Sequence, residues 1–437
     1  MVKGVKLTLV SSVIALTLLS GCGGYDNEDK NVVGSNLILT QDTFTPVVDV
    51  PKAAIQAGLD AQGGGQQALL GIKSYKIDYK TKDAHGKEII ASGLITVPAI
   101  SKEFMAAYKQ QTGRDFSLSI VSDQHGTIFT KAEAPTAEAL ATHRPNVLST
   151  AFSGVAGFMT VQPDYPGYGD SNVSHPFILE KPLANCTVDM IKAAIAFANK
   201  AKLPINGQVF LSGYSEGGYA TMAAAKEIQE NHPELHLMAV APMAGPYDLE
   251  KIGLGVFSEP VMAFPPYLAF VIKAYSDTYE DVNLSDVIVD QYVPVVNTIF
   301  DGEHNATVAY VSLPNMLSGN PADQAPDKLF KATFMSDYAN DANTPLRKHF
   351  IENSPIDWKP AVPMKLLHCT NDEIIPYAMS QLAYQSFTQQ GSTTVELVPI
   401  EGVTADPSKH ETVHGDCAQA AYSQVIPWFD KIRKGEK

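Results

Sequence analysis

The sequence predicts an α/β fold in which a mostly parallel central sheet is covered by helices on both faces. Six short apolar runs have the length and composition of buried strands. They lie at residues 116–121, 158–162, 209–211, 237–241, 364–367 and 394–399. Helical periodicity occurs between several of them, as at 187–200. Strands that alternate with helices indicate parallel pairing, because each crossover helix returns over a face of the sheet.

The first 21 residues predict a secretory targeting segment. Lys3 and Lys6 precede an apolar stretch, residues 7–19, that is too short for a permanent membrane-spanning helix. The stretch ends in Leu19-Ser20-Gly21-Cys22, which resembles a bacterial lipoprotein signal cleaved before Cys22. The alternative is an ordinary secretory signal in which Cys22 is incidental.

Acylation of Cys22 would anchor the chain outside the cytoplasm through its N-terminus. Gly23 stands where an aspartate typically retains lipoproteins at the inner membrane, which favours the outer membrane of a Gram-negative bacterium. The residues that follow are polar and include glycine, so residues 22–45 predict a flexible tether.

Size and charge limit the remaining possibilities. A length of 437 residues exceeds what one hydrophobic core usually fills, so a large insertion or a second domain is expected. The chain has 32 basic and 47 acidic residues, for a net charge of -15, and no basic stripe. This charge balance opposes binding to nucleic acid.

The predicted core has two parts separated by an insertion. Residues 46–248 form the first part, which opens with a hairpin of strands at 75–79 and 88–97 around a polar turn. Residues 249–347 break the alternation, because they are rich in proline and aromatic residues and show helical patterning at 286–300. They predict a largely helical cap over the carboxyl ends of the strands, with a simple packing appendage as the alternative. Residues 348–437 complete the core.

The motif Gly213-Tyr214-Ser215-Glu216-Gly217 joins an apolar run to a helical run of small residues. A serine on such a strand-to-helix turn is exposed to a base that can remove its proton, so Ser215 is the candidate nucleophile. The backbone N–H of Glu216, at the helix start, is a candidate oxyanion donor. A glycine-rich loop without chemistry is the alternative.

An acid and a base follow in the order that this chemistry requires. Asp372 lies in the loop after the apolar run 364–367, four residues before Pro376, and is preferred over the adjacent Glu373 as the orienting acid. His414 stands directly before an amphipathic closing helix and is preferred as the base over His410, which lies in a polar loop.

A second oxyanion donor is expected after the strand at 116–121. Gly126 lets the backbone approach a substrate carbonyl, so the N–H of Thr127, or of Gly126 itself, can point into the site. His125 is interpreted as structural, or as part of the pocket lining.

Together these motifs resemble the α/β-hydrolase superfamily and are similar to bacterial relatives of the secretory lipase and lipase-A-like group, over roughly residues 70–434. The resemblance includes Gln124-His125-Gly126-Thr127, the loop Asp164-Tyr165-Pro166-Gly167-Tyr168-Gly169, the serine turn, the Asp372 loop and His414-Gly415. It implies hydrolysis of small-molecule or lipid carboxylic esters without a cofactor.

Three cysteines remain after Cys22, namely Cys186, Cys369 and Cys417. If Asp372 orients His414, then Cys369 and Cys417 both lie near that contact, and a disulfide between them is favoured. No Cys-x-x-Cys pair accompanies them, and no metal site is predicted.

Two other functions fit parts of this pattern. A secreted aminopeptidase on the same fold would need an acid in the cap to hold the substrate amine, and Glu259, Asp277, Glu280 and Asp290 are available. A surface binding protein with a vestigial site has no evident need for all three members of a Ser-Asp-His set in this order.

Overall fold

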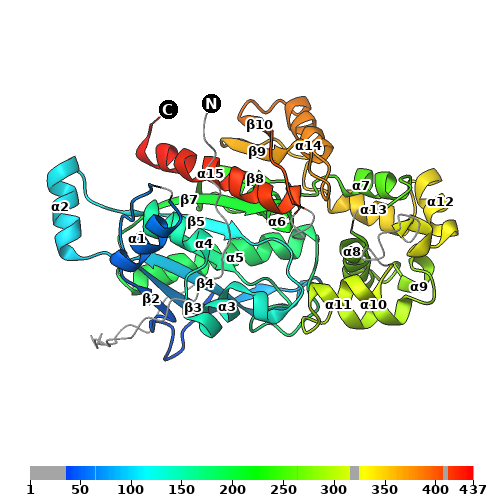
Figure 1. The fold of residues 1–437 in the computed structure, drawn as a ribbon, viewed down its shortest axis with the longest axis horizontal. Coiled ribbons are helices and arrows are strands. Elements are labelled where there is room, and N and C mark those ends of the chain that lie inside the picture. The colour runs from blue at the N-terminus through cyan, green and yellow to red at the C-terminus, as the bar shows by residue number, and fades with distance from the viewer. Residues whose placement is uncertain (1–35, 64, 263, 315–323, 407–411, 437) are drawn as a thin grey trace.

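A mixed sheet of ten strands runs through the protein (Figure 1). The computed structural model describes residues 36–436 of the chain, except 64, 263, 315–323 and 407–411. The strands are β1 (Leu37–Ile38), β2 (Val48–Val50), β3 (Ile72–Lys82), β4 (Glu88–Pro98), β5 (Leu118–Gln124), β6 (Met159–Pro163), β7 (Ile205–Tyr214), β8 (His236–Met243), β9 (Met364–Cys369) and β10 (Val395–Ile400).

The strand order explains how the sheet is mostly parallel. It runs β1-β3-β4-β6-β5-β7-β8-β9-β10, with β2 paired to β3. The six strands from β6 to β10 in this order pair in parallel, whereas β1, β2, β3 and β4 pair antiparallel. The six predicted apolar runs fall in the parallel strands, and the predicted hairpin is β3–β4. The predicted α/β class is therefore confirmed.

Helices flank the sheet and extend beyond it (Figure 1). They are α1 (Lys52–Ala61), α2 (Lys102–Thr112), α3 (Pro135–Thr142), α4 (Val147–Ser149), α5 (Glu180–Lys200), α6 (Glu216–Asn231), α7 (Leu249–Val256), α8 (Pro265–Thr278), α9 (Leu284–Val287), α10 (Val293–Ile299), α11 (Ala306–Ser312), α12 (Ala332–Asn340), α13 (Pro345–Glu352), α14 (Ala378–Gln389) and α15 (Val413–Lys434).

Strand β7 shows why both faces of the sheet are covered. Successive side chains of a strand point to opposite faces. Phe210 packs on the face under α15, where its ring lies 5.0 Å from that of Phe429. Val209 and Leu211 pack on the other face with Met222 of α6. All of these side chains are buried, and each contributes about 1.5–3 kcal/mol of hydrophobic stabilisation.

Helices α7 to α13 gather at one end of the molecule, and α2 projects at the other (Figure 1). An aromatic contact joins this helical end to the body, since Phe270 of α8 stacks on Phe177 at 4.5 Å. Phe270 also stacks on Phe300, within the helical end, at 4.5 Å. The helical segment predicted at 286–300 is wrong in one respect, because α9 and α10 are separate helices. Pro294 lies in the first turn of α10, where its missing N–H is tolerated, so a new helix begins there.

Regular structure begins before the C-terminal end of the tether predicted over 22–45. Strand β1 already pairs with β3, with Leu37 opposite Tyr79, because its backbone groups complete the edge of the sheet. The predicted signal at 1–21 and Cys22 lie outside the described residues. None of the helices in the described part of the chain is long and apolar enough to span a membrane.

Candidate active site

Ser215 lies at a sharp turn between β7 and α6. Its backbone has φ 62° and ψ -123°, a region that residues with a side chain rarely adopt. The turn is held from both sides, because the Ser215 N–H donates to Met243 O at 2.9 Å and its carbonyl accepts from Tyr219. A Cβ on Gly217 would lie only 2.0 Å from Gln124 O, so the close approach of α6 to β5 requires glycine.

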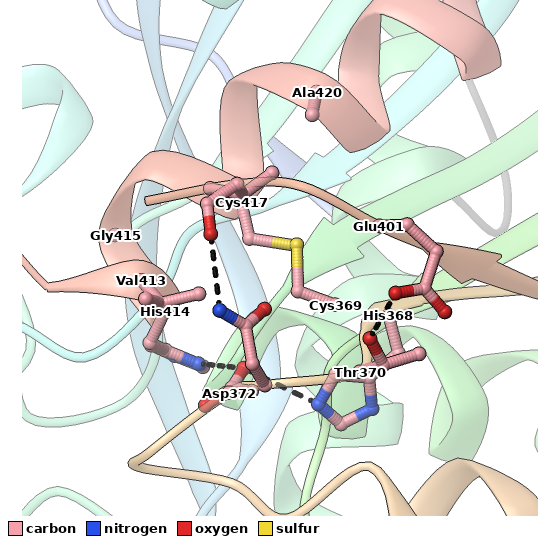
Figure 2. The surroundings of a disulfide bond; sticks show 12 residues. His368, Cys369, Thr370, Asp372, Glu401, Val413, His414, Gly415, Cys417 and Ala420 are labelled. Carbon is pink, nitrogen blue, oxygen red and sulfur yellow. Dashed lines mark hydrogen bonds and ion pairs between the residues drawn. A yellow bond between two sulfur atoms is a disulfide. The ribbon is translucent and has the colours of Figure 1, made fainter. Parts of the chain in front are cut away.

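The side chains of His414 and Asp372 meet at the carboxyl ends of the strands (Figure 2). Nδ1 of His414, in the first turn of α15, lies 2.6 Å from Oδ2 of Asp372, in the loop after β9. The other carboxylate oxygen of Asp372 accepts the backbone N–H groups of Ile374 and Ile375 at 2.9 Å each. This leaves Nε2 of His414, which is buried and has no hydrogen-bond partner among the described residues.

The residue before Ser215 brings the turn to this pair. The Tyr214 hydroxyl donates to His414 O at 2.7 Å, and the two rings lie 5.0 Å apart. The first turn of α15 is itself capped, since the Thr412 hydroxyl accepts the N–H of Gly415 at 3.0 Å. The serine turn and the imidazole are therefore tied together through one tyrosine.

Glu373 has a different partner from its neighbour Asp372. Its carboxylate accepts the backbone N–H of Val413 at 2.8 Å and that of His414 at 3.2 Å. It therefore satisfies donors at the N-terminus of α15, where negative charge is favourable. His410, the other candidate base, lies outside the described residues.

His368 contacts the same carboxylate. It was not predicted from the sequence as a site residue, although it directly follows the apolar run 364–367. Its Nε2 lies 2.9 Å from Ile375 O and 3.2 Å from Oδ2 of Asp372 (Figure 2). Burial raises the pKa of Asp372, but the hydrogen bonds and charges of His368 and His414 outweigh it and hold this pKa well below its ordinary value. Asp372 is therefore an anion that can stabilise a protonated His414.

A disulfide joins Cys369, at the end of β9, to Cys417 of α15 (Figure 2). It lies three residues from Asp372 on one side and three from His414 on the other. In the described part of the chain, Cys186 is free and buried, with Sγ 2.9 Å from the Tyr79 hydroxyl. No group of three or more His, Cys, Asp or Glu side chains within that part could hold a metal ion.

The loop after β5 presents backbone to Ser215. A Cβ on Gly126 would lie 3.8 Å from the Cβ of Ser215. His125 orients this loop, since its Nδ1 donates to Gly126 O at 2.7 Å, and in a trans peptide the N–H of Thr127 then points the opposite way. The Tyr165 hydroxyl likewise donates to His125 O at 3.1 Å, which turns the N–H of Gly126 away from that bond.

A cavity of about 290 Å³ lies between the core and the helical end. Its walls include Tyr168 and His175 from the core and Phe270 and Phe300 from the helical end. His175 also contacts the carboxylate of Glu216, the residue that follows Ser215, with Nε2 2.7 Å from Oε1. His175 was not singled out in the sequence, because no local pattern marks it.

The fold, the parallel sheet and the strand-turn-helix at Ser215 place this protein among the α/β-hydrolases. The sequence matches the family model of the secretory lipases over residues 146–430, more than half of the chain, and the chain belongs to that family. No curated protein matches the sequence significantly.

Solved structures agree with this assignment. The ligand-bound form of LipA from Xanthomonas oryzae, a rice cell wall degrading esterase, is 25% identical with a TM-score of 0.75, and the match covers 93% of this chain and 98% of that one. A putative hydrolase from Legionella pneumophila is also 25% identical, with a TM-score of 0.76 and coverage of 92% and 99%. Candida antarctica lipase A, at 18% identity, TM-score 0.55 and coverage of 82% and 76%, shares the fold. The protein is a carboxylic ester hydrolase.

Proposed function

We propose that the protein hydrolyses carboxylic esters through a Ser215-His414-Asp372 triad and an acyl-enzyme intermediate. Ser215 Oγ attacks the ester carbonyl while Nε2 of His414 takes its proton, and the protonated imidazole then passes that proton to the leaving alcohol. A water molecule, activated by the same imidazole, attacks the acyl-enzyme and releases the carboxylic acid. Asp372 holds the imidazole with its proton on Nδ1 and stabilises the imidazolium.

The observation that carries this proposal is the Asp372–His414 contact of 2.6 Å beside the strained serine turn. The contact supports Nε2 as the base, because Nδ1 donates to the carboxylate and Nε2 has no partner among the described residues. Tyr214 brings the histidine to the turn. The alternative acid, Glu373, is occupied by backbone N–H groups, which supports the choice of Asp372.

The oxyanion that forms at the substrate carbonyl would be held by backbone donors. The N–H of Glu216 lies at the start of α6, where the first N–H groups of a helix have no partner within the helix. The N–H of Thr127, or of Gly126, comes from the loop that His125 orients. Loss of one such donor in other hydrolases costs about 10²–10³-fold in kcat.

Residues 249–347 would act as the cap on the core formed by residues 46–248 and 348–437. Phe270 and Phe300 from this segment line the 290 Å³ cavity together with His175. These rings, beside the polar side chains of Lys131 and Asp301, would contact the acyl or alcohol group of an ester. The segment would therefore determine which esters reach Ser215. The protein would act as a carboxylesterase or as a lipase.

The four acids named for the aminopeptidase alternative do not support it. Glu259, Asp277, Glu280 and Asp290 are all exposed, and none of them lines the cavity. Asp277 pairs with Lys273 and Asp290 with Lys331. A site for a substrate ammonium group needs a carboxylate that faces the reaction centre.

The N-terminal segment would place the enzyme outside the cytoplasm, in keeping with a family of secretory lipases. Lipidation at Cys22 would hold it on a membrane, and the residue after Cys22 favours the outer membrane. Expression of the full chain beside a Cys22→Ser variant tests this: membrane fractionation should show the first with the outer membrane and the second released.

The catalytic proposal is tested with purified protein that lacks residues 1–22. It is offered p-nitrophenyl esters of increasing chain length and aminoacyl p-nitroanilides, with Ser215→Ala as the matched control. Ester turnover that Ser215→Ala abolishes is the expected result. Equal turnover by the two proteins, or release of p-nitroaniline without ester turnover, would contradict the proposal.

A further inference from the structure

Glu216 follows the proposed nucleophile and has a buried side chain. It is 1% exposed, and its partner His175, from the segment between β6 and α5, is 6% exposed. Oε1 of Glu216 lies 2.7 Å from Nε2 of His175, and Oε2 has no hydrogen-bond partner among the described residues. A buried carboxylate without compensation is costly, so its state of charge depends on His175.

The hydrogen bonds of His175 determine how many protons the His175–Glu216 pair holds. Nδ1 of His175 lies 2.9 Å from Pro166 O, and a carbonyl can only accept, so Nδ1 carries a proton. The contact between Nε2 and Oε1 then needs one more proton, whichever atom holds it. The pair is either imidazolium with carboxylate or imidazole with carboxylic acid, and both have zero net charge.

The rings around His175 hold it in this orientation. Tyr168 and Tyr165 lie 4.5 and 5.9 Å from it, centroid to centroid, and Phe270 of α8 lies at 5.8 Å. The Tyr165-Pro166-Gly167-Tyr168 loop also wraps around it, because a Cβ on Gly167 would lie 2.6 Å from the Cα of His175. The loop therefore holds this imidazole in a fixed orientation.

The other titratable groups near the pair are phenols, a partly buried lysine and an exposed aspartate. Tyr165 and Tyr168 come from the loop and Tyr267 from α8. Burial, followed by the charge of Glu216, raises the pKa of Tyr165 and Tyr168 well above its ordinary value, so these phenols stay neutral. Lys131 and Asp301 line the same cavity as His175. His175 is therefore the group that compensates Glu216.

We propose that His175 is a positioning residue that cancels the charge of the Glu216 side chain, so that the N–H of Glu216 can stabilise the oxyanion. This inference rests on the proposed function, because it assigns that N–H to the oxyanion. For an assumed separation of about 6 Å and an effective dielectric constant near 20, Coulomb repulsion by an uncompensated carboxylate would slow formation of the oxyanion by about 100-fold. The compensation removes that repulsion.

The test is a double-mutant cycle measured as a function of pH. Its variants are His175→Phe, Glu216→Gln and the double variant, each assayed for kcat and KM on a p-nitrophenyl ester from pH 6 to pH 9. In the Glu216 background, loss of His175 should lower kcat by a factor that grows with pH towards about 100, as the lone carboxylate ionises. In the Glu216→Gln background the same loss should be small and independent of pH.

Two results would overturn the inference. The first is a ratio of kcat with His175 to kcat without it that does not change with pH in either background, because His175 then only packs. The second is a ratio that still changes with pH in the Glu216→Gln background. If His175→Phe does not fold, His175→Gln keeps a neutral donor and should show the same pH-dependent loss. Labelling of Ser215 by a fluorophosphonate separates the two proposals: an unlabelled Ser215 contradicts the triad, whereas a labelled Ser215 with a flat ratio contradicts only the role of His175.

Discussion

Nδ1 of His414 lies 2.6 Å from Oδ2 of Asp372, although 42 positions separate the two residues in the sequence. The contact forms because β9 delivers Asp372 to the end of the sheet and α15 begins beside it. It makes the loop after β9 and the first turn of α15 a single unit.

Asp372→Asn is expected to lower kcat by about 10³–10⁴-fold with little change in KM, because the amide would no longer hold His414 in the required tautomer. Glu373→Gln is the matched control, since it alters the adjacent side chain, whose hydrogen bonds within the described part of the chain go to backbone at the start of α15. It should keep kcat within about threefold and cost about 0.5–1 kcal/mol of stability. Steady-state kinetics on one ester compares the two, and an equal loss in both would contradict the assignment of Asp372.

His125→Leu is expected to lower kcat by about 10–100-fold, because the Gly126–Thr127 peptide would lose the hydrogen bond that turns its N–H towards the site. His125→Asn places an amide donor near the position of Nδ1 and should recover most of the activity. Both variants are measured for kcat and KM separately. A loss that is the same in both, or that appears only in KM, would show that the histidine does not act through this peptide.

Opening the disulfide between Cys369 and Cys417 is expected to lower both stability and kcat. The bond closes a loop with a sequence separation of 48, for which the chain-entropy estimate is about 4 kcal/mol. Urea unfolding and ester turnover are compared for the protein and for Cys369→Ser/Cys417→Ser, and for the first with and without reductant. Cys186→Ala controls for the free thiol and should respond to reductant as the parent does. Unchanged stability in the double serine variant would refute the prediction.

Asp123 is expected to make stability depend on pH. Burial raises its pKa to about 6, although the Ser212 and Tyr422 hydroxyls both donate to Oδ1 at 2.8 Å. Because this folded-state pKa exceeds the unfolded value of about 3.9, Asp123 contributes stability below about pH 4 that is lost as the pH rises through 6. The free energy of unfolding of the parent, minus that of Asp123→Asn, should fall by about 2.4 kcal/mol from pH 4 to pH 8. Urea titrations at both pH values measure it, and a difference that does not change with pH would contradict this account.

The sequence by itself determined the α/β class and the strand-turn-helix at Ser215, because both depend on local patterns. Period-two and helical spacing and the glycines at 213 and 217 are visible within a few residues. The boundary between α9 and α10 was harder to see, since helical spacing continues across the break at Pro294.

Only the tertiary structure decided which side chains meet. Asp372 and Glu373 are neighbours with the same chemistry, and it is the path of the chain after β9 that directs one to the imidazole of His414 and the other to the backbone of α15. The contacts of His368 with Asp372 and of His175 with Glu216 likewise leave no local signal. Their physical reason is that burial and charge pairing depend on segments far apart in the chain, which come together only when the sheet and its helices have packed.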